Sequence, residues 1–161
     1  MAEAYAPAGP ALAAHVAYYA PCIAEFRDSR ATGAPLLMLW GGKDAIVDAE
    51  RCGEVVADLT TGADVTTAVY ADAYHQWDGR FSGPRPIGRD LSGCRFVVRE
   101  DGSVYGYWSG IDMTGPFTRK LLLWLCTADE GYLIGRDDAV RARSNAAAGR
   151  FLARALAGEG G

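Results

Sequence analysis

The sequence predicts an α/β fold in which parallel strands are flanked by helices and a β-hairpin is inserted. The first observation is a continuous apolar run at residues 35–40, which starts with a proline and ends at two glycines. Such a short run between turn residues is typical of a strand buried on both faces. The second observation is a strand–helix–strand succession over residues 35–70, whose strands lie too far apart for a hairpin. This succession indicates a parallel sheet.

Three strands and one helix are expected in the first half of the chain. We expect a strand before and a strand after residues 35–40 in the sequence. The first is at residues 15–20, which are aromatic and β-branched, and the second is at residues 64–70, which are rich in Val and Thr. Residues 48–61 predict a helix, because Asp48 can cap its start and apolar residues recur every three to four positions. Residues 23–33 show a mixed composition and end in a loop.

The second half is more varied. Residues 80–93 hold Gly, Pro, Arg and Ser without a period, which predicts a surface loop. Residues 94–99 and 104–108 predict a hairpin closed by an Asp-Gly turn. Residues 121–126 fit either a helix or a strand, and we favour a short helix that packs on the core.

The clearest helix in the sequence covers residues 137–157. Asp137 or Asp138 can cap its start, and Gly158 can end it. Residues 2–10 resemble the tail of a helix followed by a Pro/Gly connector, and they lack the basic start of a signal peptide.

Composition excludes several functional classes. The 161 residues suit one domain, half of them are apolar, and the net charge is −4. Basic residues are scattered, so we expect no nucleic-acid partner. No apolar run is long enough to span a bilayer, so we expect no membrane association.

The four cysteines allow two interpretations. Cys22, Cys52, Cys94 and Cys126 form no C-x-x-C pair, so neither a zinc site nor a redox motif is indicated. We favour buried free thiols, which are usual in a cytoplasmic protein. The alternative is a pair of disulfides, 22–52 and 94–126, which would indicate a periplasmic or secreted protein.

Asp44 and His75 are the candidate catalytic residues. Each follows a predicted parallel strand, so both are expected at the same edge of the sheet, where ligands of α/β proteins bind. An acid after one strand and a histidine after the next is the order of the last two triad members in α/β-hydrolases. His15 lies within a predicted strand, and we expect it to be a packed or surface residue.

The motifs around these residues resemble the dienelactone hydrolase family. The run from Pro35 to Asp44 is similar to the family pattern P-x-L-x-L-x-G-x-x-D, and His75 lies in a Y-x-x-A-x-H-x-F-like run in which Trp77 replaces the usual Phe. The resemblance covers residues 12–79 and includes the first predicted strand. It implies a partial α/β-hydrolase fold, hydrolysis of small-molecule esters or lactones, and catalysis by Asp44 and His75. No metal and no cofactor are expected.

The family also needs a nucleophile in a G-x-[C/S]-x-G elbow. No such motif occurs in the 161 residues. We therefore interpret residues 1–161 as one domain that is the C-terminal half of the family's domain, with residues 80–135 as an insertion. This chain alone is expected to be inactive.

Two further expectations concern partners. The strand at residues 15–20 should leave an open sheet edge, which favours a homodimer or association with a complementary piece. The alternative to a hydrolase is a non-catalytic remnant or binding module that uses the hairpin aromatics Tyr105, Tyr107 and Trp108. We favour packing of these aromatics in the core.

Overall fold

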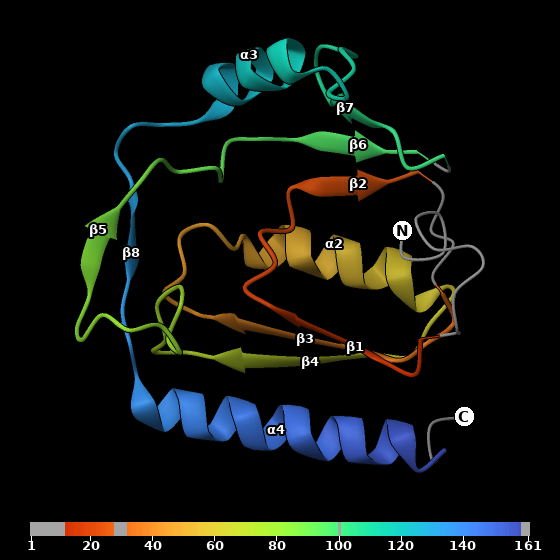
Figure 1. The fold of residues 1–161 in the computed structure, drawn as a ribbon, viewed down its shortest axis with the longest axis vertical. Coiled ribbons are helices and arrows are strands. Elements are labelled where there is room, and N and C mark those ends of the chain that lie inside the picture. Colours follow the sequence, from red (N-terminus) through yellow and green to blue (C-terminus); the bar gives the residue numbers. More distant parts are fainter. Residues whose placement is uncertain (1–11, 28–31, 100, 159–161) are drawn as a thin grey trace.

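The centre of the molecule is a three-stranded parallel sheet in the order β1-β3-β4 (Figure 1). The computed structural model describes residues 12–27, 32–99 and 101–158. The three strands are β1 (His15–Tyr18), β3 (Leu36–Gly41) and β4 (Val65–Tyr70). Helix α2 (Ala49–Thr60) covers one face of the sheet and helix α4 (Asp138–Leu156) covers the other (Figure 1). The α/β class, the parallel sheet and the flanking helices are therefore confirmed.

Strand β3 is the middle strand of the sheet, and its side chains alternate between two apolar layers. Leu37 and Leu39 belong to a core that includes apolar residues of α4, whereas Met38 and Trp40 belong to a core that includes apolar residues of α2. All four side chains are buried. A strand with helices on both faces needs apolar residues at every position, which explains the continuous run in the sequence.

Both helices begin at the predicted aspartates. The Asp48 carboxylate accepts hydrogen bonds from the backbone N–H groups of Glu50 and Arg51 at the start of α2. Asp137 caps α4 in the same way. These bonds satisfy N–H groups that have no partner inside the helix.

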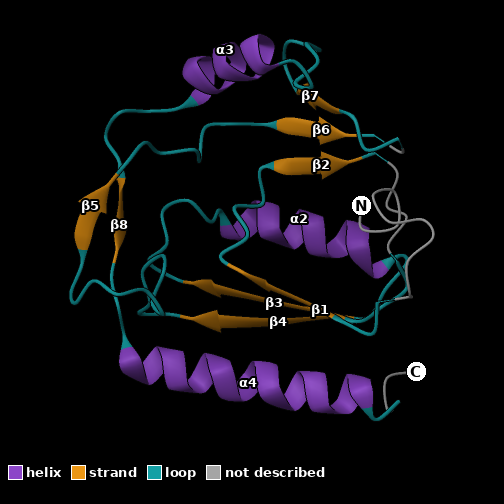
Figure 2. Cartoon of the chain, in the orientation of Figure 1, coloured by secondary structure: helices purple, strands orange, loops and turns teal. Residues whose placement is uncertain are grey.

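A second sheet lies beyond α2 and contains the predicted hairpin (Figure 2). Its strands are β2 (Ala24–Phe26), β6 (Phe96–Val98) and β7 (Val104–Gly106). Strands β6 and β7 pair antiparallel, and β2 pairs parallel with β6. The mixed segment at residues 23–33 thus contains a strand that the sequence did not reveal.

A third pairing corrects the loop predicted at residues 80–93. Strand β5 (Arg85–Ile87) pairs antiparallel with β8 (Tyr132–Ile134). Both strands have three residues, which is too short for a recognisable alternation of apolar and polar side chains. Their partners are also distant in sequence, so only the tertiary structure defines them.

Helix α3 (Pro116–Cys126) forms the outermost layer, over the second sheet (Figure 1). The helix predicted at residues 121–126 is confirmed, but its packing differs from the expectation. Leu122 is its one buried residue, whereas Trp124 and Leu125 are 65% and 63% exposed. Within the described residues, no helix combines the length and apolar character needed to cross a membrane.

The cysteines correct another expectation. Disulfides join Cys22 to Cys52 and Cys94 to Cys126, so none of the four remains a free thiol. The first bond ties the residues after β1 to α2, and the second ties the start of the hairpin to the end of α3. The partners lie 30 and 32 positions apart, and spacings of this length carry no sequence motif.

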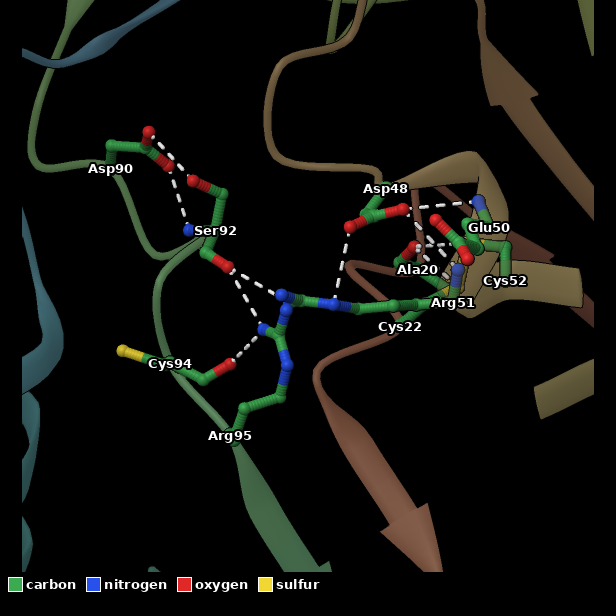
Figure 3. A network of polar contacts seen from close by, with 10 residues as sticks. All are labelled: Ala20, Cys22, Asp48, Glu50, Arg51, Cys52, Asp90, Ser92, Cys94 and Arg95. Carbon is green, nitrogen blue, oxygen red and sulfur yellow. Dashed lines mark hydrogen bonds and ion pairs between the residues drawn. A yellow bond between two sulfur atoms is a disulfide. The ribbon is translucent and has the colours of Figure 1, made fainter. Parts of the chain in front are cut away.

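A polar network connects the segment before β6 to helix α2 (Figure 3). The guanidinium groups of Arg51 and Arg95 both donate to the Ser92 carbonyl, across 3.0 and 2.9 Å. Arg51 also pairs with Asp48 at 3.1 Å. The network therefore links α2 to the strand that begins the hairpin.

The hairpin aromatics are less buried than expected. Trp108 is 85% exposed and Tyr107 is 41% exposed, and the two rings contact each other edge to face. Tyr105 is half-buried and lies beneath the Arg99 guanidinium, 3.9 Å from its ring centre. Core packing was therefore the wrong expectation for Tyr107 and Trp108. The predicted helix tail at residues 2–10 lies outside the described residues.

Candidate active site

The loop that carries Asp44 fits tightly against the loop that leads to His75. A Cβ atom on Gly41 would lie 2.2 Å from the Ala73 carbonyl oxygen, and one on Gly42 would lie 2.5 Å from that of Ala71. The backbone N–H groups of residues 42 and 43 donate to carbonyls of residues 70 and 73. The two glycines are therefore needed for close approach of two backbones, rather than for the sharp turn that their pairing in the sequence suggests.

Asp44 is buried and both of its carboxylate oxygens have partners. The side chain has no exposed surface, and Oδ1 accepts a hydrogen bond from the Ile46 backbone N–H across 3.1 Å. Oδ2 lies 2.7 Å from Nδ1 of His75. An ionised carboxylate only accepts hydrogen bonds, so Nδ1 is the donor and Nε2 is left as a proton acceptor.

The imidazole of His75 is mostly covered by the residues around it. Its side chain is 12% exposed. Tyr19, just after β1, and Tyr132, at the start of β8, place their ring centres 5.0 and 5.2 Å from the imidazole. Two residues later, the buried indole of Trp77 donates to the Ser144 hydroxyl across 3.0 Å, which anchors the histidine loop to α4.

Tyr19 supports the histidine loop through a second contact. Its hydroxyl donates to the Asp78 carboxylate across 2.6 Å. Burial raises the pKa of Tyr19 above its ordinary value, and the hydrogen bond to Asp78 raises it further. Tyr19 has a φ of 55°, an uncommon conformation for a residue with a side chain, and this lets the chain turn at the end of β1.

Taken together, these contacts place a buried carboxylate beside an imidazole, which is the arrangement that the acid and the base of a hydrolytic triad have. A buried carboxylate fixes the imidazole tautomer and stabilises the imidazolium that forms when Nε2 takes a proton. His15 lies elsewhere, with Nε2 2.8 Å from the Thr32 hydroxyl. In the described residues, no hydroxyl or thiol forms a hydrogen bond to Nε2 of His75, and all four cysteines are bonded in disulfides.

A comparison with protein families identifies the chain. The model of the dienelactone hydrolase family matches residues 1–83, a range that includes both Asp44 and His75. The chain belongs to the dienelactone hydrolase family. The curated proteins gave no match, and neither did the solved structures. Most of residues 80–135 lies outside the region matched by the dienelactone hydrolase model.

Sequence reasoning missed the aromatic residues that surround the imidazole. Tyr132 reaches His75 only because β8 pairs beside the histidine loop, and β8 is too short to be recognised in the sequence. The sequence pattern indicates Tyr19 only as part of a strand. Its signal is the proline and cysteine that follow shortly after it and mark the strand end, which places it at the same edge as Asp44.

Proposed function

We propose that this dienelactone hydrolase relative acts on ester or lactone bonds through a nucleophile–His75–Asp44 triad. The observation that carries the proposal is the 2.7 Å contact between His75 Nδ1 and a fully buried Asp44 carboxylate. A buried carboxylate at this distance is the arrangement that keeps an imidazole ready to act as a general base. The nucleophile belongs to a segment outside the 161 residues.

The proposed reaction depends on the proton at Nδ1 of His75 and on the free acceptor at Nε2. Nε2 of His75 removes the proton from the nucleophile, which attacks the carbonyl carbon of the ester or lactone. The imidazolium, stabilised by Asp44, then gives that proton to the leaving alkoxide. Water repeats the sequence on the acyl-enzyme and releases the acid.

The edge of the parallel sheet supports the idea of a complementary segment. Strand β1 pairs with β3 on one side, and its other edge has no strand partner among residues 12–27, 32–99 and 101–158. An unpaired strand edge offers N–H and C=O groups to a further strand. We propose that a nucleophile-bearing strand, or a second copy of the chain, pairs there.

A fluorogenic-ester assay on the purified 161-residue chain tests this division of roles. The chain alone should show no turnover above that of the His75→Ala variant. Turnover that disappears in His75→Ala would show that the chain already holds its nucleophile. Reading upstream of Met1 for an in-frame G-x-[C/S]-x-G motif is the matching genetic observation.

A second candidate function is a binding module without catalysis. The observation in its favour is an exposed apolar face of α3, where Phe117, Trp124 and Leu125 recur at helical spacing and are 76%, 65% and 63% exposed. Monomeric proteins rarely expose several large apolar side chains together. Light scattering of the wild type and a Phe117→Ser/Trp124→Ser variant tests it, since the variant should lose self-association only if this face of α3 binds another copy.

We also propose that the protein works in an oxidising compartment, either the periplasm or the extracellular space. The two disulfides support this alternative over the cytoplasm that the free-thiol interpretation favoured. Peptide mapping without reduction on protein from its natural source tests it. Four free thiols in that sample would exclude it.

A further inference from the structure

The imidazole of His75 is contacted by a ring from the segment predicted as an insertion. The Tyr132 ring is perpendicular to it, at 90°, with the two centres 5.2 Å apart. The Tyr19 ring contacts the same imidazole at 55°. Edge-to-face contacts at this spacing are favourable, and the edge-to-face ring of Tyr132 together with the tilted ring of Tyr19 restricts the rotation of the imidazole between them.

The strand that carries Tyr132 is fixed to the histidine loop by its backbone. The Gly135 N–H donates to the His75 carbonyl across 3.1 Å, and the Asp137 N–H donates to the Trp77 carbonyl across 2.9 Å. On its other side β8 pairs with β5, which places Tyr132 opposite Ile87. The position of Tyr132 is therefore set relative to the backbone of His75 itself.

The turn before Tyr132 is also fixed. Gly131 has a φ of +68°, and a Cβ atom there would lie 2.8 Å from the Ile87 carbonyl oxygen. Asp90 and Ala128 exchange two backbone hydrogen bonds. The Cys94–Cys126 disulfide closes the segment just upstream. These constraints make a wide excursion of the Tyr132 ring costly.

The ring of Tyr132, rather than its hydroxyl, makes the contact. In the described part of the chain, no group forms a hydrogen bond with this hydroxyl. Partial burial raises the pKa of Tyr132, and the negative charges of Asp44 and Asp90 add to the effect. The side chain is therefore neutral at physiological pH and brings no charge to the imidazole.

We propose that Tyr132 is a positioning residue that keeps the His75 imidazole turned with Nδ1 towards Asp44. Its importance for turnover rests on the proposed function, but its effect on the ring orientation does not. In this role the segment at residues 80–135 contributes directly to the geometry of the Asp44–His75 pair. Loss of the Tyr132 ring would let the imidazole rotate and let water reach the Nδ1 proton.

Histidine-labelled ¹⁵N NMR on the 161-residue chain tests this proposal. A His15→Gln background leaves one imidazole, whose Nδ1 proton should give a downfield resonance. That resonance should be lost in Tyr132→Leu, because its proton exchanges with water. It should persist in Tyr132→Phe, which keeps the ring. It should also persist in Leu133→Ala, which alters an exposed neighbour on the same strand.

Two results separate this proposal from the proposed function. An unchanged Nδ1 resonance in folded Tyr132→Leu would overturn the role of Tyr132 and leave the Asp44–His75 pair intact. A resonance that survives Asp44→Asn, or that is missing from the wild type, would instead contradict the proposed function. If Tyr132→Leu does not fold, or if the wild type lacks the resonance, nuclear Overhauser contacts between the Tyr132 and His75 rings in the wild type decide. Their absence overturns the proposal and their presence supports it.

Discussion

The buried indole of Trp77 donates a hydrogen bond to the hydroxyl of Ser144, 3.0 Å away on α4. Both side chains have no exposed surface. The contact connects the loop of His75 to the longest helix of the chain. This hydrogen bond therefore holds the candidate site against the core, and the aromatic contacts around the imidazole add to its effect.

Ser144→Ala tests this anchor. The substitution leaves the indole N–H of Trp77 buried without its partner, so the free energy of unfolding should fall by about 1–3 kcal/mol. Asn145→Ala, at the exposed neighbouring position of α4, is the matched control and should change it by less than about 0.5 kcal/mol. Equal effects of the two variants in urea denaturation would contradict the anchor.

Gly41→Ala tests the close approach of the two loops. The new Cβ would lie 2.2 Å from a backbone oxygen, so the loops must separate, and we expect a loss of about 1–3 kcal/mol of stability. Gly53→Ala is a control that should change the stability in the opposite direction. It lies in α2, where the added Cβ would have no atom within 4 Å apart from the adjacent helix backbone, and it should stabilise the protein by about 0.5–1 kcal/mol. A neutral Gly41→Ala would show that the loops are loosely packed.

Removal of a disulfide should be costly. The Cys94–Cys126 bond closes a loop with a sequence separation of 32. Replacing both cysteines with serine should therefore lower stability by about 2–4 kcal/mol. Denaturation of the wild type with and without a reductant provides the comparison. Reduction should lower the stability of the wild type. It should leave unchanged the stability of a variant that lacks both disulfides. A wild type that is insensitive to reductant would contradict the prediction.

Alkaline pH should destabilise the fold through Tyr19. Its pKa is raised in the folded state, mainly by burial and then by Asp78, so the folded protein holds this proton when the unfolded chain has released it. Stability is complete below about pH 10, the ordinary tyrosine pKa, and falls as the pH rises above it, by up to about 1.4 kcal/mol per pH unit. Tyr19→Phe should show a shallower decline in denaturation between about pH 9 and pH 11. Identical slopes would exclude this role for Tyr19.

Local signals in the sequence predict the first sheet and its helices. The continuous run of β3 and the capping residues Asp48 and Asp137 act within a few positions, so the chain alone reveals them. The pairing of β2 with β6 and of β5 with β8 depends on contacts between distant, very short strands. The same is true of Tyr132, whose contact with His75 exists only once β8 is in place.

The disulfides show a second limit of prediction from the sequence. The sequence allows both pairings but favours free thiols, because no motif distinguishes a bonded cysteine from a buried one at these spacings. The contact of Asp44 with His75 was expected from strand order alone. Its distance, and the burial that makes Asp44 an effective hydrogen-bond acceptor, required the structure.

The most direct test of the central claim uses the protein in the form that its natural source produces. Its kcat/KM is measured with a fluorogenic ester. His75→Ala should lower kcat/KM by about 10²-fold or more, because the general base is lost. His15→Gln, the matched control at the other histidine, should leave kcat/KM unchanged. A His75→Ala protein that keeps wild-type activity would contradict the assignment of His75 and Asp44 to a catalytic triad.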